Sequence, residues 1–239
     1  MIADPEIARA FETTWPAAEY AEAGGFRVGR GLGAGGRVSS ARALAPDWQA
    51  ADIPRVEAIQ RGWDERPMFR VADADTALQE ALRAQGYRHG TPTAIMAADC
   101  AALAAEPAPP LAAFAIWPPL AIQRDIWSGG GIPASRQAVM ERVAQPRTAI
   151  LGRVQDRAAG AAFVARDGRV AMIHGIEVVP ALRRQGVAGW LLRKAAEWAA
   201  AEGATRLALA VRRDNAHARA LYQRLGFADL GGYGYWTRD

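Results

Sequence analysis

The chain has 239 residues, of which 51% are hydrophobic and 23% charged, a composition typical of a soluble globular protein and not of a disordered one. Its net charge of +4 comes from arginines interleaved with acidic residues, which indicates a mild preference for anionic ligands and no nucleic-acid partner. The single cysteine, Cys100, excludes an intrachain disulfide and a cysteine-rich metal site.

The sequence shows no signal for secretion or membrane insertion. The segment “MIADPEIARAFETTWP” lacks the basic region and apolar core of a signal peptide. The weakly apolar stretch 101–122 contains five prolines and Glu106, which disfavour a membrane helix. We therefore expect a cytoplasmic protein with no membrane partner.

The first part of the chain, residues 1–100, predicts a mixture of helices and strands. Residues 25–44 predict a hairpin around “GLGAGG”, and the strand-like flanks favour a turn there over a phosphate loop. After it we expect, in order, a helix “IPRVEAIQRGW”, a strand “MFRVAD”, a helix “DTALQEALRAQG” and a strand “TPTAIMAAD”.

Residues 101–112 are rich in alanine and proline and predict a linker. We expect a second domain over 113–239. Its predicted elements are a strand “FAIWPPLAI”, a helix “PASRQAVMERVAQ”, the strands “RTAILGRVQD”, “AAGAAFVARDG” and “RVAMIHGIEVVP”, a helix from Val187 to Gly203, a strand “TRLALAV”, a helix “NAHARALYQRLG” and a final strand pair through “GYGYWTRD”. Helices alternating with strands after a meander predict an α/β or α+β fold with a parallel step across the Val187 helix.

The two parts share a short internal echo. “ALRAQGY” followed by a strand in the first part corresponds to “LYQRLGF” followed by a strand in the second. The same order of helix, glycine, aromatic residue and strand is what a decayed duplication would leave.

The segment “VVPALRRQGVAG” places a strand end, a turn and a helix start in succession. The first N–H groups of a helix have no partner within it and, with the helix dipole, favour an anion. Gly186 and the small Ala188 would let a phosphate approach, and the arginines before them add charge. Neither Gly-Lys-Ser/Thr nor G-x-G-x-x-G occurs in the segment, which disfavours a Walker-type loop and a dinucleotide fold. Taken alone, the segment fits a plain turn with solvated arginines equally well.

Two linked motifs resemble those of the GNAT superfamily of acyl-CoA-dependent N-acyltransferases. The first is the pyrophosphate signature Arg/Gln-x-x-Gly-x-Gly/Ala after a strand ending in Val-x-Pro, met by Arg183, Gly186 and Ala188 after “VVP”. The second lies on the next helix but one, at Asn215, Ala218, Leu221, Tyr222, Gly226 and Phe227. The resemblance covers residues 111–239 well, and residues 1–100 only as a degraded half of the same fold. Ala188 replaces the commoner glycine, which the signature allows.

This resemblance implies a fold, domains and a donor. The fold would be a GNAT-like mixed central sheet flanked by helices, with a degenerate GNAT-like domain over 1–100, a linker over 101–112 and a catalytic domain over 113–239. Acetyl-CoA would be the co-substrate, its pyrophosphate on the helix N-terminus and its pantetheine arm paired like an extra strand. The implied binding residues are Ile176, Val178, Val179, Arg183, Arg184, Gln185, Gly186, Val187, Ala188, Gly189 and Asn215.

The resemblance also implies direct attack of an amine on the thioester. The N–H of Val178 would polarise the thioester carbonyl, and Tyr222 would be the acid that protonates the leaving thiolate. Two residues compete as the base. His174 lies where arylalkylamine acetyltransferases of the superfamily carry a relay histidine, and its ordinary pKa suits the task. Glu177 would point to the opposite side of a regular strand, unless a bulge reverses it.

The remaining candidates are less defined. His89 and His217 have no partners at metal-ligand spacing, so no metal site is expected. One or two aromatic residues could line the acceptor pocket, from a set of Trp117, Trp127, Tyr233, Tyr235 and Trp236.

The expected function is N-acetylation of a primary amine on a small molecule or peptide by a monomer or homodimer. The alternative is a non-catalytic acyl-CoA-binding regulatory module on the same fold. The presence of both His174 and Tyr222 favours catalysis.

Overall fold

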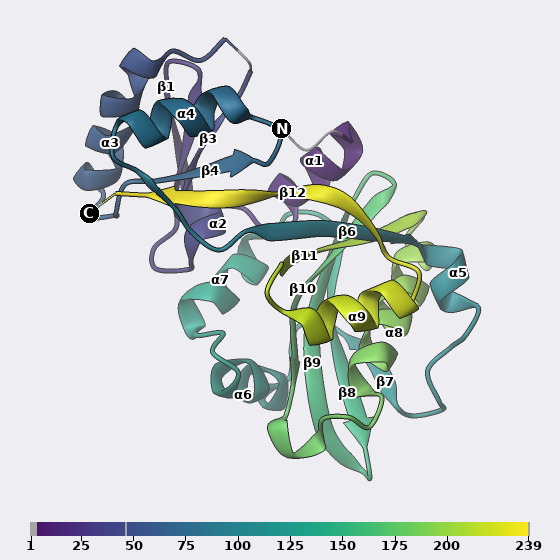
Figure 1. Cartoon of the computed structure of the whole chain (residues 1–239). Coiled ribbons are helices and arrows are strands. Elements are labelled where there is room, and N and C mark those ends of the chain that lie inside the picture. Colours follow the sequence, from purple (N-terminus) through teal and green to yellow (C-terminus); the bar gives the residue numbers. More distant parts are fainter. Residues whose placement is uncertain (1–3, 46, 239) are drawn as a thin grey trace.

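In the computed structural model, which describes residues 4–45 and 47–238, the strands of the described residues form one mixed sheet (Figure 1). Its order is β1-β2-β3-β4-β12-β6-β11-β10-β9-β8-β7, and β5 pairs with β12. The strands are β1 (Glu19–Ala23), β2 (Phe26–Arg30), β3 (Ala41–Ala43), β4 (Met68–Ala72), β5 (Arg88–His89), β6 (Thr93–Asp99), β7 (Ala113–Ile116), β8 (Arg147–Val154), β9 (Arg157–Asp167), β10 (Val170–Val178), β11 (Arg206–Arg212) and β12 (Ala228–Thr237). The helices are α1 (Pro5–Thr13), α2 (Gly36–Ser39), α3 (Ile53–Gly62), α4 (Thr76–Ala84), α5 (Cys100–Ala104), α6 (Ala121–Gly129), α7 (Ala134–Arg142), α8 (Val187–Ala201) and α9 (Ala216–Arg224), with single 3-10 turns at Ala50–Asp52 and Pro180–Leu182.

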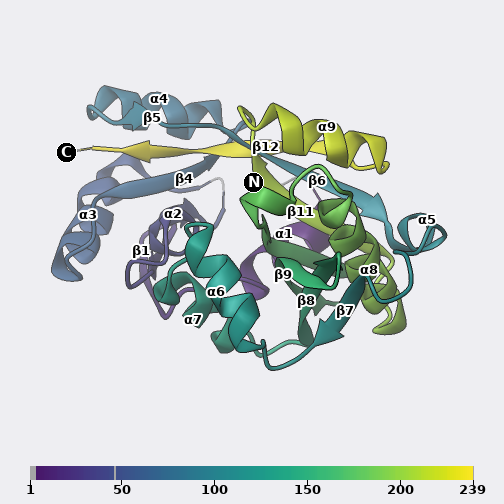
Figure 2. The same cartoon turned by 90° about the horizontal axis from the view of Figure 1, so that it is seen from below.

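Helices cover both faces of the sheet. The apolar side of α8, with Leu191, Leu192 and Ala195 fully buried, packs on one face of the strands from β7 to β11. On the other face, α1 and α6 pack against β9 and β10. Figure 2 shows α4 and α9 on one side of β12 and the helices α1, α6 and α7 on the other. This is the mixed sheet flanked by helices that the sequence predicts.

The two halves of the chain exchange strands where they meet. The N-terminal half (residues 4–99) supplies β6, which lies between β11 and β12 of the C-terminal half (residues 113–238). In return β12 lies between β6 and β4 and is antiparallel to both. The two strands run side by side through the middle of the molecule (Figure 1). Neither half therefore has a complete sheet of its own.

The halves repeat the same local structure, which confirms the internal echo. Asp75 and Asn215 each cap a helix by accepting a hydrogen bond from the N–H three residues on, and a glycine with positive φ ends each helix. The strand pairing follows the same repeat. Thr93 and Tyr233, which hold equivalent positions in the two halves, pair with each other across β6 and β12. A local two-fold axis therefore passes between these two strands.

The end of the chain differs from the prediction. The predicted final strand pair is wrong: residues 228–237 form one strand, β12, with a register shift between Asp229 and Gly232. The glycines there, which favour a turn, serve close packing instead, because a Cβ on Gly232 would meet the carbonyl oxygen of Thr93 at 2.1 Å.

Several elements have no counterpart in the prediction. These are β1, β5, α1, α2, α5 and α6. α5 takes up the start of the stretch predicted as a linker and packs against α8. Among the described residues, no helix has both the length and the apolar character that crossing a membrane requires.

Candidate active site

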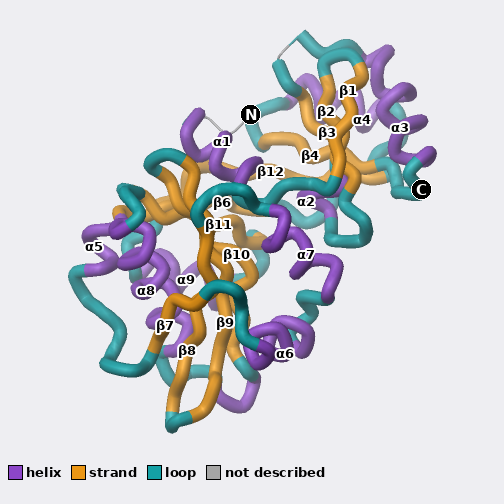
Figure 3. The backbone as a smooth tube through the Cα atoms, turned by 180° about the vertical axis from the view of Figure 1, so that it is seen from behind, coloured by secondary structure: helices purple, strands orange, loops and turns teal. Residues whose placement is uncertain are grey.

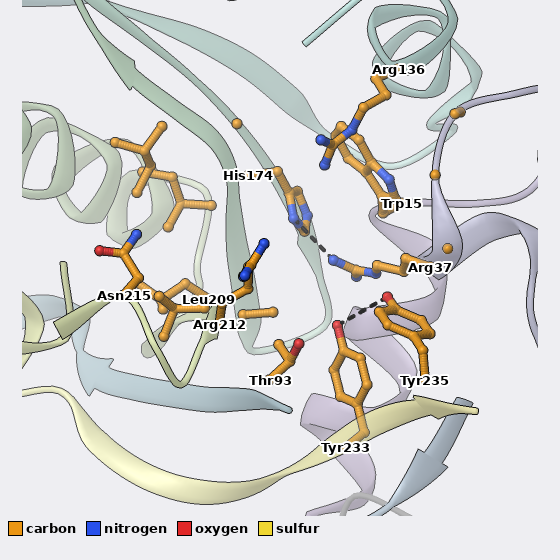
Figure 4. A pocket seen from close by; sticks show the side chains of 18 of the residues that line it. Trp15, Arg37, Thr93, Arg136, His174, Leu209, Arg212, Asn215, Tyr233 and Tyr235 are labelled. Carbon is orange, nitrogen blue, oxygen red and sulfur yellow. Dashed lines mark hydrogen bonds between the residues drawn. The ribbon is translucent and has the colours of Figure 1, made fainter. Parts of the chain in front are cut away.

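A cavity opens in the sheet where β10 and β11 separate. The two strands pair in parallel only from Val170 to Met172, opposite Arg206 to Ala208. Beyond that point they diverge, and residues 173–176 and 209–212 line opposite walls of a cavity of about 430 Å³. Figure 4 shows that side chains from both halves of the chain surround it. A gap between parallel strands leaves one backbone edge of each free to bind a ligand.

A bulge in β10 brings both candidate bases to one face of the sheet. His174 pairs with Phe163 on β9, whereas Glu177 pairs with Ala161. Glu177 is three residues after His174, whereas their partners on β9 are two residues apart. β10 therefore contains one extra residue, which forms a β-bulge. Phe163 and Ala161 share a face, and so do His174 and Glu177. The bulge that would reverse the direction of Glu177 is therefore present.

His174 is buried and both of its ring nitrogens are occupied. Arg37 Nη1 lies 3.2 Å from Nδ1, and Thr14 Oγ1 lies 3.0 Å from Nε2. A guanidinium can only donate, so Nδ1 is an acceptor and Nε2 carries the proton. The Thr14 hydroxyl then accepts from Nε2 and donates to the carbonyl oxygen of Ala10 at 2.6 Å. This chain of hydrogen bonds fixes a neutral imidazole with no free acceptor.

The surroundings of His174 reinforce its neutral form. Burial, and then the positive charges of Arg37 and Arg136, lower the pKa of His174 well below 6.5. The ring also packs between Trp15 and Phe163, with centroid separations of 5.0 and 6.1 Å. His174 is thus neutral throughout the physiological range.

Glu177 lies further along the same face, beside the start of the phosphate-type loop. Its side chain is 17% exposed, and its Oε1 accepts from Arg183 Nη2 at 3.1 Å. Gly130, at the end of α6, lies so close that an added Cβ would meet the Glu177 side chain at 2.2 Å. Unlike His174, the carboxylate has oxygen lone pairs left to accept a proton.

The loop before α8 has the backbone shape of an anion site. Arg184 and Gly186 both have positive φ, of 65° and 88°, and α8 begins directly after Gly186 with no side chain capping its first N–H groups. Arg183 donates from Nε to the carbonyl oxygen of Val178 at 3.1 Å. Its guanidinium therefore ties the loop to β10, while the N–H groups of Gln185 to Gly189 are the donors placed for an anion.

Gly186 gives a stability prediction for this loop. We expect Gly186→Ala to lower the free energy of unfolding by about 1–2 kcal/mol, because φ at this position is +88° and the added Cβ would lie 3.1 Å from the Trp190 ring. Gly189→Ala is the matched comparison, since its Cβ would meet only Arg193 Nη1, at 3.9 Å. Within a helix that change should stabilise by about 1 kcal/mol. Urea denaturation of both variants measures the two effects, and equal stabilities would contradict the left-handed assignment.

Tyr222 and Asn215 reach the cavity from the opposite face of the sheet. Asn215 caps α9, accepting from the N–H of Ala218 at 3.1 Å. Tyr222 is buried against Phe227, with ring centroids 5.7 Å apart, and burial raises the pKa of its hydroxyl to about 12. Among the described residues this hydroxyl has no hydrogen-bond partner, which leaves it available to a ligand.

The structure thus brings only some of the predicted site residues to the cavity itself. His174, Ile176, Asn215 and Tyr222 line it, whereas Glu177, Val178, Val179 and residues 183–189 lie outside its lining. Among the aromatic candidates, Tyr233 and Tyr235 line the cavity, while Trp127 donates to the carbonyl oxygen of Gly175 at 2.8 Å beneath the bulge.

Other lining residues were not predicted from the sequence. They come from segments far from the motifs, namely Trp15, Arg37, Thr93 and Arg136. No local pattern marks them, because they reach the cavity only through the packing of α1, α2, β6 and α7. Figure 3 shows α7 beside α2, where Ser135 Oγ donates to the carbonyl oxygen of Gly33 at 3.2 Å.

No group of three or more His, Cys, Asp or Glu side chains is arranged to hold a metal ion within the part of the chain that the structure describes.

Comparison with known proteins finds a family match for part of the chain. Residues 120–227 match the family model described as Acetyltransferase (GNAT) family. A search of curated proteins finds no match.

Solved structures share the fold over most of the chain. A GCN5-related N-acetyltransferase from Kribbella flavida is 19% identical with a TM-score of 0.74, covering 99% of this chain and 96% of that one. A tandem GNAT protein from the clavulanic acid biosynthesis pathway is 17% identical with a TM-score of 0.63, covering 83% and 74%. A putative acetyltransferase of the GNAT family from Novosphingobium aromaticivorans is 20% identical with a TM-score of 0.57, covering 91% and 89%.

At these identities the likeness concerns the fold, and the family assignment rests on the matched residues. Acetyl transfer from acetyl-CoA to an amine is the general reaction of that family. The match shows that residues 120–227 are a GNAT-family acetyltransferase domain.

Proposed function

We propose that the protein transfers the acetyl group of acetyl-CoA to a primary amine by direct attack in a ternary complex. The observation that carries this proposal is the cavity between β10 and β11. It is open to Tyr222 from one face of the sheet and to His174 from the other, and the loop with anion-binding shape leads into α8 beside it. A donor held along the free edge of β10 would present its thioester between these two faces.

The backbone of β10 and the start of α8 would hold the donor. The N–H of Val179 donates to the carbonyl oxygen of Ala159 on β9 at 2.8 Å. Because successive N–H groups of a strand point to opposite edges, the N–H of Val178 faces away from β9, toward the separation. Val178 is therefore placed to polarise a thioester carbonyl. The pyrophosphate would bind the N–H groups of residues 185–189, with Arg183 as a positioning residue.

Glu177 is the base that we propose. Attack by the amine nitrogen forms the C–N bond and breaks the C–S bond, so the amine must lose a proton and the thiolate must gain one. His174 cannot accept that proton while Arg37 donates to Nδ1. Glu177 would take it, directly or through water, and His174 would help to shape the acceptor side.

Tyr222 is the acid that we propose, which gives a direct test. Because burial raises its pKa to about 12, the hydroxyl stays protonated at neutral pH and can donate to the departing sulfur. We expect Tyr222→Phe to lower kcat for amine acetylation about 100-fold with little change in the KM for acetyl-CoA. The rate of thiol release from acetyl-CoA measures kcat. Mass spectrometry identifies the product by the added mass of one acetyl group on the amine. An unchanged kcat would remove Tyr222 from the mechanism.

Between pH 7 and about pH 10 the wild-type profile should show no alkaline fall from Tyr222, since its proton is lost only near pH 12.

We further propose that the N-terminal half does no chemistry of its own. It repeats the cleft, since β3 and β4 pair in parallel at only one position and a second cavity, of about 590 Å³, opens beside them. In the repeat, however, Leu82 stands at the position of Tyr222. No counterpart of “RRQGVAG” precedes α3. The half would instead shape the acceptor side of the C-terminal domain.

A non-catalytic acyl-CoA-binding module is the competing function. It predicts that acetyl-CoA binds, by calorimetry, without thiol release above the hydrolytic background on any amine. Turnover that depends on Tyr222 would exclude it.

A further inference from the structure

Arginine side chains, and no carboxylates of the described residues, line the cavity. Its lining residues include Arg37, Arg136 and Arg212 but no aspartate or glutamate among the described residues. Arg212 is exposed and already paired with Asp214, with an N–O distance of 2.6 Å. The two other arginines are the ones that flank His174 (Figure 4).

Arg37 is a half-buried cation that forms no ion pair with a carboxylate of the described residues. Its guanidinium bonds to His174 and to the carbonyl oxygen of Phe11, and it lies over the Phe11 ring at 3.6 Å. Its Nε is buried and has no hydrogen-bond partner in the part of the chain that the structure describes. Burial lowers the pKa of Arg37 to about 10, so it is still charged at neutral pH.

The nearby carboxylate does not neutralise this region. Glu12 forms ion pairs with Arg70 and with Arg42, the latter at 3.4 Å. Arg37 is thus the third arginine to share one carboxylate. A buried charge that is not compensated by the protein is costly, which indicates that a ligand supplies the compensation.

Arg136 adds a second free cation at the same place. It lies on α7 and is exposed, and within the described residues its side chain has no ion-pair or hydrogen-bond partner. Figure 4 shows its guanidinium directed toward His174 and Trp15. Its charge lowers the pKa of His174, which places it within electrostatic reach of that ring.

These two arginines lie on the acceptor side of the site. His174 shares the face of the sheet covered by α1 and α6, whereas Tyr222 belongs to the core on the face covered by α8. If the sulfur of the donor lies beside Tyr222, the incoming amine must approach from the other face of the sheet, where His174 lies. The positive charge therefore acts on the acceptor and not on the pyrophosphate.

We propose that the acceptor is a primary amine that also carries a carboxylate, and that this carboxylate binds between Arg37 and Arg136. The inference rests on the proposed acetyl transfer and narrows its substrate class. Guanidinium groups bind carboxylates through paired charge-assisted hydrogen bonds. The same charges repel polyamines and other polycationic acceptors, which would need acidic residues in the cavity.

Matched pairs of acceptors test the proposal. Each α-amino acid in a panel is compared with the amine that lacks its carboxylate, such as phenylalanine with phenethylamine and tyrosine with tyramine, and spermidine is included. For the best pair we expect kcat/KM to be at least about 10-fold higher for the acid. Arg136→Gln should abolish this ratio by raising the KM for the acid, and Arg37→Gln should act likewise.

Two controls accompany the variants. Arg169→Gln removes an exposed arginine in the turn between β9 and β10, away from the cavity, and should keep the ratio. The KM for acetyl-CoA should change less than about 3-fold in Arg136→Gln. A larger rise in this KM would mean that Arg136 binds the donor and not the acceptor. A higher kcat/KM for the decarboxylated amine or for spermidine would overturn the proposal, as would a ratio unaffected by Arg136→Gln.

Binding separates this inference from the proposed reaction. In calorimetry with the CoA-bound protein, the acids should bind and their decarboxylated partners should not, with binding lost in Arg136→Gln. If no amine is acetylated but the acids still bind in this way, acetyl transfer fails and the carboxylate site stands. If no acid binds, the carboxylate site is wrong whatever the turnover.

Discussion

We expect that a fragment of residues 113–239 does not fold alone, although it contains the family match and both motifs. In the whole protein β11 and β12 do not pair with each other, because β6 from the N-terminal half lies between them. Without residues 93–99, the backbone groups on the edges of both strands that face β6 lose their partners, and the core loses the buried side chains of Ala94 and Met96. We expect no cooperative unfolding transition for this fragment by circular dichroism, against a single transition for the full chain.

Complementation provides the control for this prediction. Residues 1–112 and 113–239 expressed together should associate and recover the transition, because the exchanged strands can pair between two chains as they do within one. A fragment of residues 90–239, which retains β6, should recover part of it. Cooperative unfolding of 113–239 alone would contradict the view that the exchanged strand is needed for folding.

Glu177→Gln should lower kcat for amine acetylation by about 100- to 1,000-fold, the second large effect that we expect. The substitution keeps the shape of the side chain and removes the proton acceptor. His174→Gln should cost less than about 10-fold, because an amide can accept from Arg37 and donate to Thr14 as the neutral imidazole does. Initial rates at saturating acetyl-CoA and acceptor measure both.

Glu177 also pairs with Arg183, so a purely structural origin must be distinguished from base catalysis. Arg183→Gln breaks the same ion pair but leaves the carboxylate. If Glu177 only positions the loop, Arg183→Gln should reproduce the loss, and the loss should appear in the KM for acetyl-CoA. If His174→Gln instead shows the larger fall in kcat, His174 is the base and its bond with Arg37 must open during turnover.

The sequence was most informative where chemistry is local. The turn before α8 and the helix stop at Gly226 each follow from neighbouring residues, and the structure has them where they are predicted. The pairing of β6 with β11 depends on segments far apart along the chain, and nothing in either strand specifies its neighbour. The glycines near the end of the chain favour a turn, but they lie at a bulge in β12. Pairing with the distant strand β6 determines their conformation.

In the site, too, residues in local motifs were predicted and residues from distant segments were not. His174, Tyr222 and Asn215 come from recognisable motifs, and the structure brings all three to one cavity. The surroundings of His174 could not be predicted, because Thr14, directly after α1, and Arg37, on α2, belong to the other half. Those contacts change the expected behaviour of the histidine from a free base to a locked neutral ring.

The exchange of β6 and β12 also has a consequence for synthesis on the ribosome. β4 is made early, but its partner β12 follows the rest of the C-terminal half out of the exit tunnel. Until then the nascent chain exposes an unprotected strand edge with Phe69 and Val71, which are buried in the finished protein. The sheet of the N-terminal half is therefore incomplete until β12 has been made, and we expect a chaperone that shields strand edges during translation to raise the yield of active protein.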